Sequence, residues 1–224
     1  MKTQSNSETE ESATEFMLAE YATLRDLRLS LDSLGENRMN VYFAVISGAV
    51  VGLGLFNQLS GLAKTVFFIN AAVIVGLLLL GSITFVRMLH RSVNIVEYTR
   101  AMNRIRHYFS DKNPDITPYL WLSPRFSLYD DRPRLGYKVF DFQTRRLKLT
   151  GLAPMVGIIN SIIATLGIVI LTSTVFSLPL AWSVLIGLFS LLLILIAHYT
   201  YLVNYLKQKR DELEVRFPTP HKKQ

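Results

Sequence analysis

The chain has 224 residues, a formal net charge of +7 and no cysteine. The lack of cysteine excludes disulfides, thiolate metal ligands, cysteine nucleophiles and palmitoylation. Half of the residues are hydrophobic, and three long runs carry no charged side chain: residues 39–63, 65–86 and 149–206. A helix that spans hydrocarbon needs roughly 20 mainly apolar residues. The first two runs therefore predict one transmembrane helix each, and the third predicts two.

The N-terminal part is polar and acidic, unlike a secretory signal, which has a basic start and an early apolar core. We predict that residues 1–12 are disordered and that residues 13–36 form a cytosolic amphipathic helix. The apolar side chains of this helix recur at spacings of three and four: Met17, Tyr21, Leu24, Leu27, Leu31 and Leu34. Gly35 is a candidate end or hinge of the helix.

Residues 41–86 are predicted to form the first transmembrane hairpin, with a short turn over residues 57–65. No stop signal follows the second span, and the apolar pattern narrows to a stripe with a seven-residue spacing: Met88, Ile95, Met102 and Phe109. This coiled-coil heptad predicts that the second span continues into the cytosol as one helix. The sequence Asp-Lys-Asn-Pro, which ends at Pro114, is a stop signal for that helix.

Residues 87–150 hold this cytosolic extension and then an aromatic and basic interfacial segment. Four prolines between residues 110 and 150 argue against one long helix there, and aromatic side chains mixed with Arg and Lys suit the lipid headgroups. Residues 151–203 are predicted to form the second hairpin, and residues 204–224 a cytosolic tail. The predicted fold is an all-α integral membrane protein, with four transmembrane helices in two hairpins and cytosolic helical extensions.

The orientation follows from the distribution of Lys and Arg. There are four in the first 40 residues, thirteen in residues 87–150 and six from residue 204 onward, against one in residues 57–65 and none in residues 177–180. The positive-inside bias places both termini in the cytosol, in a multi-pass protein of the inner or plasma membrane of the cell.

Basic side chains at the span ends fix the topology and meet anionic lipid, with about 1 kcal/mol from each near the surface. These side chains are Arg38, Arg87, Arg91, Arg145, Arg146, Lys148, Lys207, Lys209 and Arg210. This placement favours the lipid bilayer as the partner and argues against nucleic acid. The acidic N-terminal helix is also expected to lie against the basic extension of the second span; the alternative is that both sets of charges face water.

Patterns typical of enzymes are missing. The four histidines lack a partner at metal-ligand spacing, no Gly-x-Ser-x-Gly sequence occurs, and the pair Asp130-Asp131 is typical of a solvated turn. Ser161 or Ser173 could pair with His198 only across facing spans. We therefore expect no catalytic residue, no metal site and no cofactor, in a protein that is not an enzyme.

Small residues four apart predict close helix packing: Ala44, Gly48 and Gly52 in the first span, and Gly157 and Ser161 in the third. Contacts within one chain are favoured, and contacts between chains are the alternative. Three polar side chains form a candidate intramembrane polar site: Asn70, Asn160 and His198. Hydrogen bonding between helices is the favoured interpretation, and the lining of a pore is the alternative.

Two stretches resemble a pattern in uncharacterised small bacterial membrane proteins: Ala19-Glu20-Tyr21-Ala-Thr-Leu24-Arg25, and residues 98–109. The plan of hydrophobic hairpins with cytosolic helices is also similar to the SLATT-type membrane effectors of bacterial defence systems, which have two spans rather than four. This resemblance implies a pore-forming effector and no role for individual residues.

Taken by itself, the sequence favours a non-enzymatic multi-pass membrane protein that forms a homo-oligomer, with cytosolic helices that bind a protein partner or sense a signal. One alternative is a small oligomeric pore opened by a cytosolic event. The other is a lipid-acting enzyme or transporter at the cytosolic surface, with residues 119–148 as its headgroup site.

Overall fold

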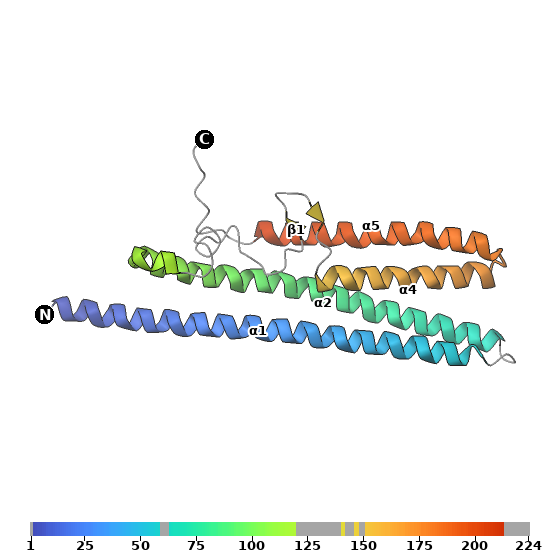
Figure 1. Ribbon diagram of the computed structural model, residues 1–224, viewed down its shortest axis with the longest axis horizontal. Coiled ribbons are helices and arrows are strands. Elements are labelled where there is room, and N and C mark those ends of the chain that lie inside the picture. The colour runs from blue at the N-terminus through green and yellow to red at the C-terminus, as the bar shows by residue number, and fades with distance from the viewer. Residues whose placement is uncertain (1, 59–62, 120–139, 142–145, 148–150, 213–224) are drawn as a thin grey trace, which may run out of the picture. The chain divides into compact units, whose positions relative to one another are not determined.

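The structure, a computed structural model, describes residues 2–58, 63–119, 140–141, 146–147 and 151–212. Four long helices hold most of these residues: α1 (Lys2–Phe56), α2 (Ala63–Lys112), α4 (Leu152–Thr174) and α5 (Leu180–Glu212) (Figure 1). The short 3₁₀ helix η1 (Pro114–Tyr119) follows α2, and β1 (Phe140–Asp141) pairs antiparallel with β2 (Arg146–Leu147). The all-α class is confirmed, and all four long helices are long and apolar enough to cross a membrane.

Helix α1 is longer and less interrupted than the sequence predicts. It begins at Lys2, within the stretch expected to be disordered, and it passes through Gly35 without a break. Near its start the Thr14 hydroxyl donates a hydrogen bond to the Glu10 carbonyl, and the Glu10 carboxylate lies 3.7 Å from Lys112 of α2. Gly35 is buried, and the packing of α1 on both sides of it offsets the roughly 1 kcal/mol that glycine costs inside a helix.

Helix α2 confirms the prediction that the second span continues as one helix until Pro114. It ends at Lys112, and the Asn113 amide still donates to the Phe109 carbonyl at 2.9 Å. Proline has no amide hydrogen to donate and cannot continue the ladder of α-helical hydrogen bonds. The chain therefore leaves the α-helix here and tightens into η1.

The turn between α4 and α5 lies between Thr174 and Leu180, inside the predicted second hairpin of residues 151–203. Ser177 adopts a left-handed φ of 50°, and the Leu178 amide donates to the Thr172 carbonyl at 3.2 Å. The Pro179 carbonyl then accepts hydrogen bonds from the amides of Trp182 and Ser183, in the first turn of α5. Helix α5 extends to Glu212, well into the predicted tail.

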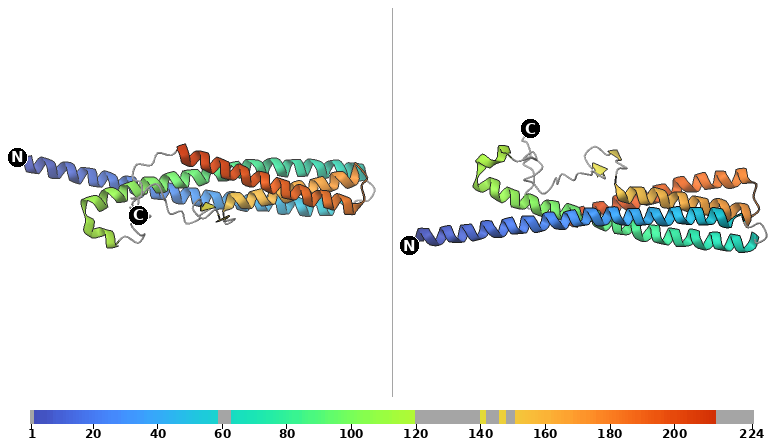
Figure 2. Two further views of the ribbon diagram at one scale, coloured as in Figure 1. Left: turned by 90° about the horizontal axis from the view of Figure 1, so that it is seen from above. Right: turned by 60° about the horizontal axis from the view of Figure 1, so that its bottom comes forward.

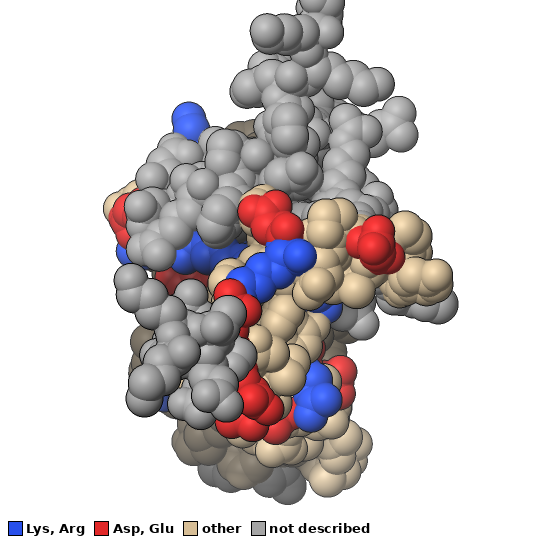
Figure 3. Space-filling view, turned by 90° about the vertical axis from the view of Figure 1, so that its left-hand side faces the viewer, with Lys and Arg blue, Asp and Glu red and all other residues tan. Residues whose placement is uncertain are grey.

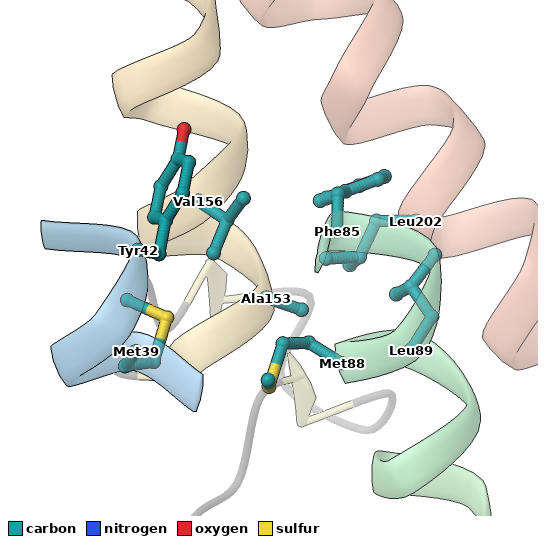
Figure 4. Close-up of a cluster of buried hydrophobic side chains, with 8 residues drawn as sticks. All are labelled: Met39, Tyr42, Phe85, Met88, Leu89, Ala153, Val156 and Leu202. Carbon is teal, nitrogen blue, oxygen red and sulfur yellow. The ribbon is translucent and has the colours of Figure 1, made fainter. Parts of the chain in front are cut away.

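The chain divides into two compact units, which are described separately. Unit 2 comprises residues 35–90 and 139–208, and within it α1, α2, α4 and α5 run alongside one another (Figures 1 and 2). All four helices contribute to its hydrophobic core (Figure 4). The buried side chains of this core are Met39, Tyr42, Phe85, Met88, Leu89, Ala153, Val156 and Leu202.

Unit 1 comprises residues 1–34, 91–138 and 209–224. In its described part, Leu24 of α1 is buried against Met102 and Ile105 of α2. Met17, Tyr21, Tyr98, Ala101 and Phe109 pack around this cluster. The expectation that the N-terminal helix lies against the extension of the second span is confirmed, and the contact is within one chain.

Candidate functional site: a polar layer in unit 2

The polar layer of unit 2 begins with one hydrogen bond between α1 and α4. The Tyr42 hydroxyl donates to Asn160 Oδ1 at 2.8 Å, and only 2% of Tyr42 and 1% of Asn160 is exposed. Figure 4 shows the Tyr42 ring lying alongside α4, next to Val156. Within the described residues, Asn160 Nδ2 is buried and has no hydrogen-bond partner. A buried amide hydrogen without a partner loses the hydrogen bond that it makes in water, so this side chain is only half satisfied.

A glycine on α2 makes room for Asn160. A Cβ atom built on Gly81 would lie 1.8 Å from Asn160 Oδ1 and 2.5 Å from its Cγ. Real Cβ atoms do not approach that closely, so any other residue at position 81 would displace the Asn160 side chain or the helix. Gly81 therefore allows the contact between α2 and the Tyr42–Asn160 pair.

Ser161 and His198 extend the layer to α5. The Ser161 hydroxyl donates to the Gly157 carbonyl at 2.7 Å, and His198 Nδ1 lies 3.0 Å from the Ile194 carbonyl and 3.4 Å from Ser161 Oγ. Because a carbonyl oxygen only accepts, Nδ1 carries the ring hydrogen. His198 therefore cannot use Nδ1 to take the proton of Ser161, and this pair lacks the geometry of a nucleophile with its base.

Gly157 brings the rings of Phe85 and His198 close to α4. A Cβ atom on Gly157 would lie 3.3 Å from Phe85 Cε2 and 3.5 Å from His198. The two rings meet edge to face, with their centroids 5.1 Å apart, which is a favoured arrangement of aromatic rings. Gly157 and Ser161, both expected to pack helices closely, do so inside this bundle.

The other small-residue motif has no such contact. Ala44, Gly48 and Gly52 are exposed, and a Cβ atom on either glycine would meet nothing within 4 Å. The sequence favours packing of these residues within the chain, but none of the described residues packs against Gly48 or Gly52. The physical reason is rotational: α1 packs in unit 2 through Met39 and Tyr42, which lie on another face of the helix.

Asn70 makes a hydrogen bond apart from the polar layer. Its Nδ2 donates to Asn57 Oδ1 at 3.0 Å, which links the two ends of the first hairpin turn. Asn70 Oδ1 is buried and has no partner among the described residues. The structure thus brings Asn160 and His198 into one polar layer, with Ser161 between them. Asn70 lies outside this layer, at the first hairpin turn.

The basic residues expected at the span ends fall into three groups. Arg38, Arg87 and Lys207 are exposed. Arg91 and Lys209 are paired with Asp32 and Glu212. Arg145 and Lys148 lie outside the described residues, as do the side chains of Arg146 and Arg210. Asp130, Asp131 and most of the proposed headgroup segment 119–148 also lie outside them.

In unit 1, Arg91 of α2 makes a clear electrostatic contact with α1. Its Nε donates to the Leu31 carbonyl at 2.7 Å and its Nη2 to Asp32 Oδ1 at 2.6 Å. The Arg91 side chain is only 14% exposed. It therefore packs against α1 and is not free to meet lipid headgroups. Nearer the end of α2, the Arg106 guanidinium donates to the Tyr21 hydroxyl and lies 5.3 Å from the centre of its ring.

A hollow of about 730 Å³ lies at the start of α1 and the end of α2, lined by Glu10, Glu11, Thr14, Glu15, Lys112 and Asn113. Figure 3 shows acidic and basic side chains next to each other on the described part of the face at this end. A hydrogen bond with the Tyr108 side chain, together with the charge of Glu10, raises the pKa of Lys112 above its usual 10.5. Lys112 is therefore charged at neutral pH.

The sequence analysis did not identify Tyr42 and Gly81 as parts of the polar layer. A tyrosine at the edge of a span is typical of an aromatic belt at the membrane surface, so its position gives no signal of a buried hydrogen bond. Gly81 lies in an apolar run without the four-residue spacing to another small residue that would have marked it. The partners of both depend on how the helices are rotated against one another.

Among the described residues, no group of three or more His, Asp or Glu side chains is placed to hold a metal ion. Comparison of the chain with known protein families, curated proteins and solved structures gives no match.

Proposed function

We propose that this chain is a non-enzymatic, multi-pass protein of the cell membrane, with both termini in the cytosol. Unit 2 would span the bilayer, and unit 1 would form a cytosolic arm that binds a protein partner or receives a signal. Large apolar side chains exposed on unit 2 support this assignment, including Phe68, Leu79, Leu188 and Phe189, which are 58–70% exposed. Soluble proteins rarely expose such an apolar surface to water, whereas lipid chains would cover it.

The observation that carries the proposal is the continuity of two helices. Helix α1 has no break between Leu34 of unit 1 and Gly35 of unit 2, and α2 has none between His90 and Arg91. A partner bound to the arm would therefore be joined to two of the spans without an intervening loop.

The arm has the surface features that partner binding needs. The Leu24 cluster and the Arg91–Asp32 pair hold its two helices together, so it can present a fixed surface. Phe16, Leu18 and Leu29 remain more than half exposed on α1. Aromatic and aliphatic anchors of this kind, beside charged residues, are typical of sites where proteins bind each other.

The polar layer supports a role in packing more than a role as a pore lining. Tyr42, Asn160 and Ser161 are buried against neighbouring helices of unit 2, and their hydrogen bonds hold α1, α4 and α5 together. A pore lining would instead face a water-filled path. We therefore place the adaptor or sensor function ahead of the oligomeric pore.

The membrane topology can be tested directly because the chain has no cysteine. Tyr119→Cys and Phe176→Cys place a single thiol at positions that are 88% and 65% exposed. With a maleimide that cannot cross membranes, Phe176→Cys should react in intact cells and Tyr119→Cys only after lysis. Labelling of both from the same side would contradict the proposed topology.

A second measurement separates the sensor from the pore. The purified protein in planar bilayers is expected to show no conductance, with or without the substitution Asn160→Ala. Conductance that requires Asn160 or His198 would overturn the proposal and establish a pore instead.

A further inference from the structure

Arg91 of α2 binds the backbone of α1 as well as one of its side chains. The Arg91 Nε donates a hydrogen bond to the Leu31 carbonyl at 2.7 Å, and Nη2 donates to the Asp32 carbonyl at 3.4 Å. The Asp32 carboxylate also accepts a hydrogen bond from Nη2, at 2.6 Å. One planar guanidinium therefore holds two consecutive residues of α1. We call Leu31, Asp32 and Arg91 together the latch.

The Leu31 carbonyl lies in the middle of a helix, where it already has a hydrogen-bond donor. Helix α1 runs without a break from Lys2 to Phe56, so this carbonyl accepts the amide of Gly35, four residues later. A carbonyl oxygen has a second lone pair, but a second donor must be able to reach it. A helical side chain leans over the turn that precedes it. Access to the Leu31 carbonyl therefore depends on the residue at position 35.

Position 35 is a glycine, which has no side chain to cover that carbonyl. Glycine is among the least favourable residues inside a helix. Gly35 does not have a positive φ, so the backbone conformation gives no reason for glycine here. The approach of Arg91 to the Leu31 carbonyl gives one, because a methyl group at position 35 would lie on the same side of the turn.

A contact with the backbone restrains α1 more than an ion pair alone. The Asp32 side chain could follow a small rotation of α1 by changing its rotamer, whereas the Leu31 carbonyl is fixed in the helix. The Leu24 cluster, about two turns earlier on α1, is apolar, and apolar contacts have no preferred direction. The latch therefore supplies the directional contact between α1 and α2 in unit 1.

We propose that the latch fixes the rotation of α1 against α2 in the arm, and that Gly35 is required because it opens the Leu31 carbonyl to Arg91. Arg91 is the first residue of α2 in unit 1, and Asp32 lies two residues before the last residue of α1 in that unit. Opening of the arm then requires release of the latch. This inference deepens the proposed function, on which the role of the arm rests, but the latch itself does not depend on the membrane topology.

A substitution that keeps the charge of Arg91 separates the latch from a simple ion pair. Hydrogen exchange of the α1 amides in unit 1, measured on the full chain in detergent, reports opening of the arm. Arg91→Lys retains the positive charge, but a single ammonium group lacks the planar fork that serves the Leu31 carbonyl and the Asp32 carboxylate together. Exchange should become about tenfold faster, because hydrogen bonds to a charged group are lost.

The matched control is Arg87→Lys, at an exposed position about one turn earlier on α2. It should leave the exchange of the same amides unchanged. Arg91→Ala should accelerate exchange at least as much as Arg91→Lys does. Full protection in Arg91→Lys would show that charge alone is sufficient, and it would overturn the latch.

The role of Gly35 is tested by a change of sign. With Arg91 present, Gly35→Ala should accelerate the exchange of these amides, because the methyl group obstructs the Leu31 carbonyl. In the Arg91→Ala background, the same substitution should slow exchange by about two- to fivefold, the usual effect of alanine in place of glycine inside a helix. Gly54→Ala is the control, because nothing lies within 4 Å of its Cβ position. Its effect on neighbouring amides should be the same in both backgrounds.

An effect of Gly35→Ala that has the same sign in both backgrounds would contradict the proposal. Faster exchange in both would mean that a contact other than Arg91 requires the glycine, and slower exchange in both would mean that none does. The labelling of Tyr119→Cys and Phe176→Cys tests the topology separately. Failure of the latch would therefore leave the proposed topology standing, and failure of the topology would leave the change of sign as the test of the latch.

Discussion

Tyr42 and Asn160 form a hydrogen bond of 2.8 Å across 118 positions of the sequence. It is the only hydrogen bond of the Asn160 side-chain amide within the described residues, since Asn160 Nδ2 has no partner there. The Tyr42 hydroxyl should therefore contribute measurably to the stability of unit 2, and substitutions at and around it measure that contribution.

Removing the hydroxyl should destabilise the bundle. Tyr42→Phe keeps the ring and leaves Asn160 buried with no hydrogen bond, which costs about 1–3 kcal/mol for an unsatisfied buried group. Unfolding of the detergent-solubilised protein, followed by circular dichroism, measures the change. Tyr199→Phe, at a residue that is 38% exposed, is the control and should be neutral. Equal stability of both variants would show that the hydrogen bond contributes nothing.

Adding one methyl group at Gly81 should also destabilise the bundle. Gly81→Ala places a Cβ atom on the Asn160 side chain, and overpacking of this kind costs about 1–3 kcal/mol. Gly76→Ala on the same helix is a matched control, because nothing lies within 4 Å of its Cβ position. The control should be neutral or more stable by about 0.5–1 kcal/mol, the usual gain from alanine inside a helix. A tolerated Gly81→Ala would contradict the placement of Asn160.

The ion pair of Arg91 with Asp32 should contribute measurably to stability, whereas the exposed pair of Arg25 with Asp26 should not. The Arg91 side chain is 14% exposed and that of Asp32 is 38% exposed. A double-mutant cycle with Arg91→Gln, Asp32→Asn and the double variant measures how the two substitutions interact in the free energy of unfolding. It should give a coupling of about 1 kcal/mol, after allowance for screening by solvent. Arg25 and Asp26 are both more than 60% exposed, so their coupling should be close to zero. Similar couplings for the two pairs would be evidence against a special role for Arg91.

The arm should open when its small core is truncated. Leu24→Ala removes a buried side chain from the contact with Met102 and Ile105 and should cost about 2 kcal/mol or more. Hydrogen exchange of the amides of α1 and α2 in unit 1 reports local opening and should become faster. Leu29→Ala, at a residue that is 59% exposed, should leave the exchange unchanged. Protection that persists in Leu24→Ala would mean that another contact holds the arm.

Local patterns correctly predicted most of the helical architecture. The uncharged runs located the apolar helices, and the heptad stripe from Met88 to Phe109 predicted the full length of α2. The prediction failed at the start of α1 and at Gly35, where it assumed disorder and a possible end of the helix. At those points the contacts of α1 with other helices, including Glu10 with Lys112, outweigh the weak local preferences of the residues.

The sequence by itself determined which segments are apolar helices and where the chain turns, because hydropathy, proline and charge act over a few neighbouring residues. Only the tertiary structure decided that Tyr42 meets Asn160, that Gly81 makes room for them, and that Gly157 packs against neighbouring helices while Gly48 meets none of the described residues. Those contacts depend on the rotation and register of helices far apart in the sequence. A change of one position along a helix turns a side chain by about 100°, and composition and spacing do not record that angle.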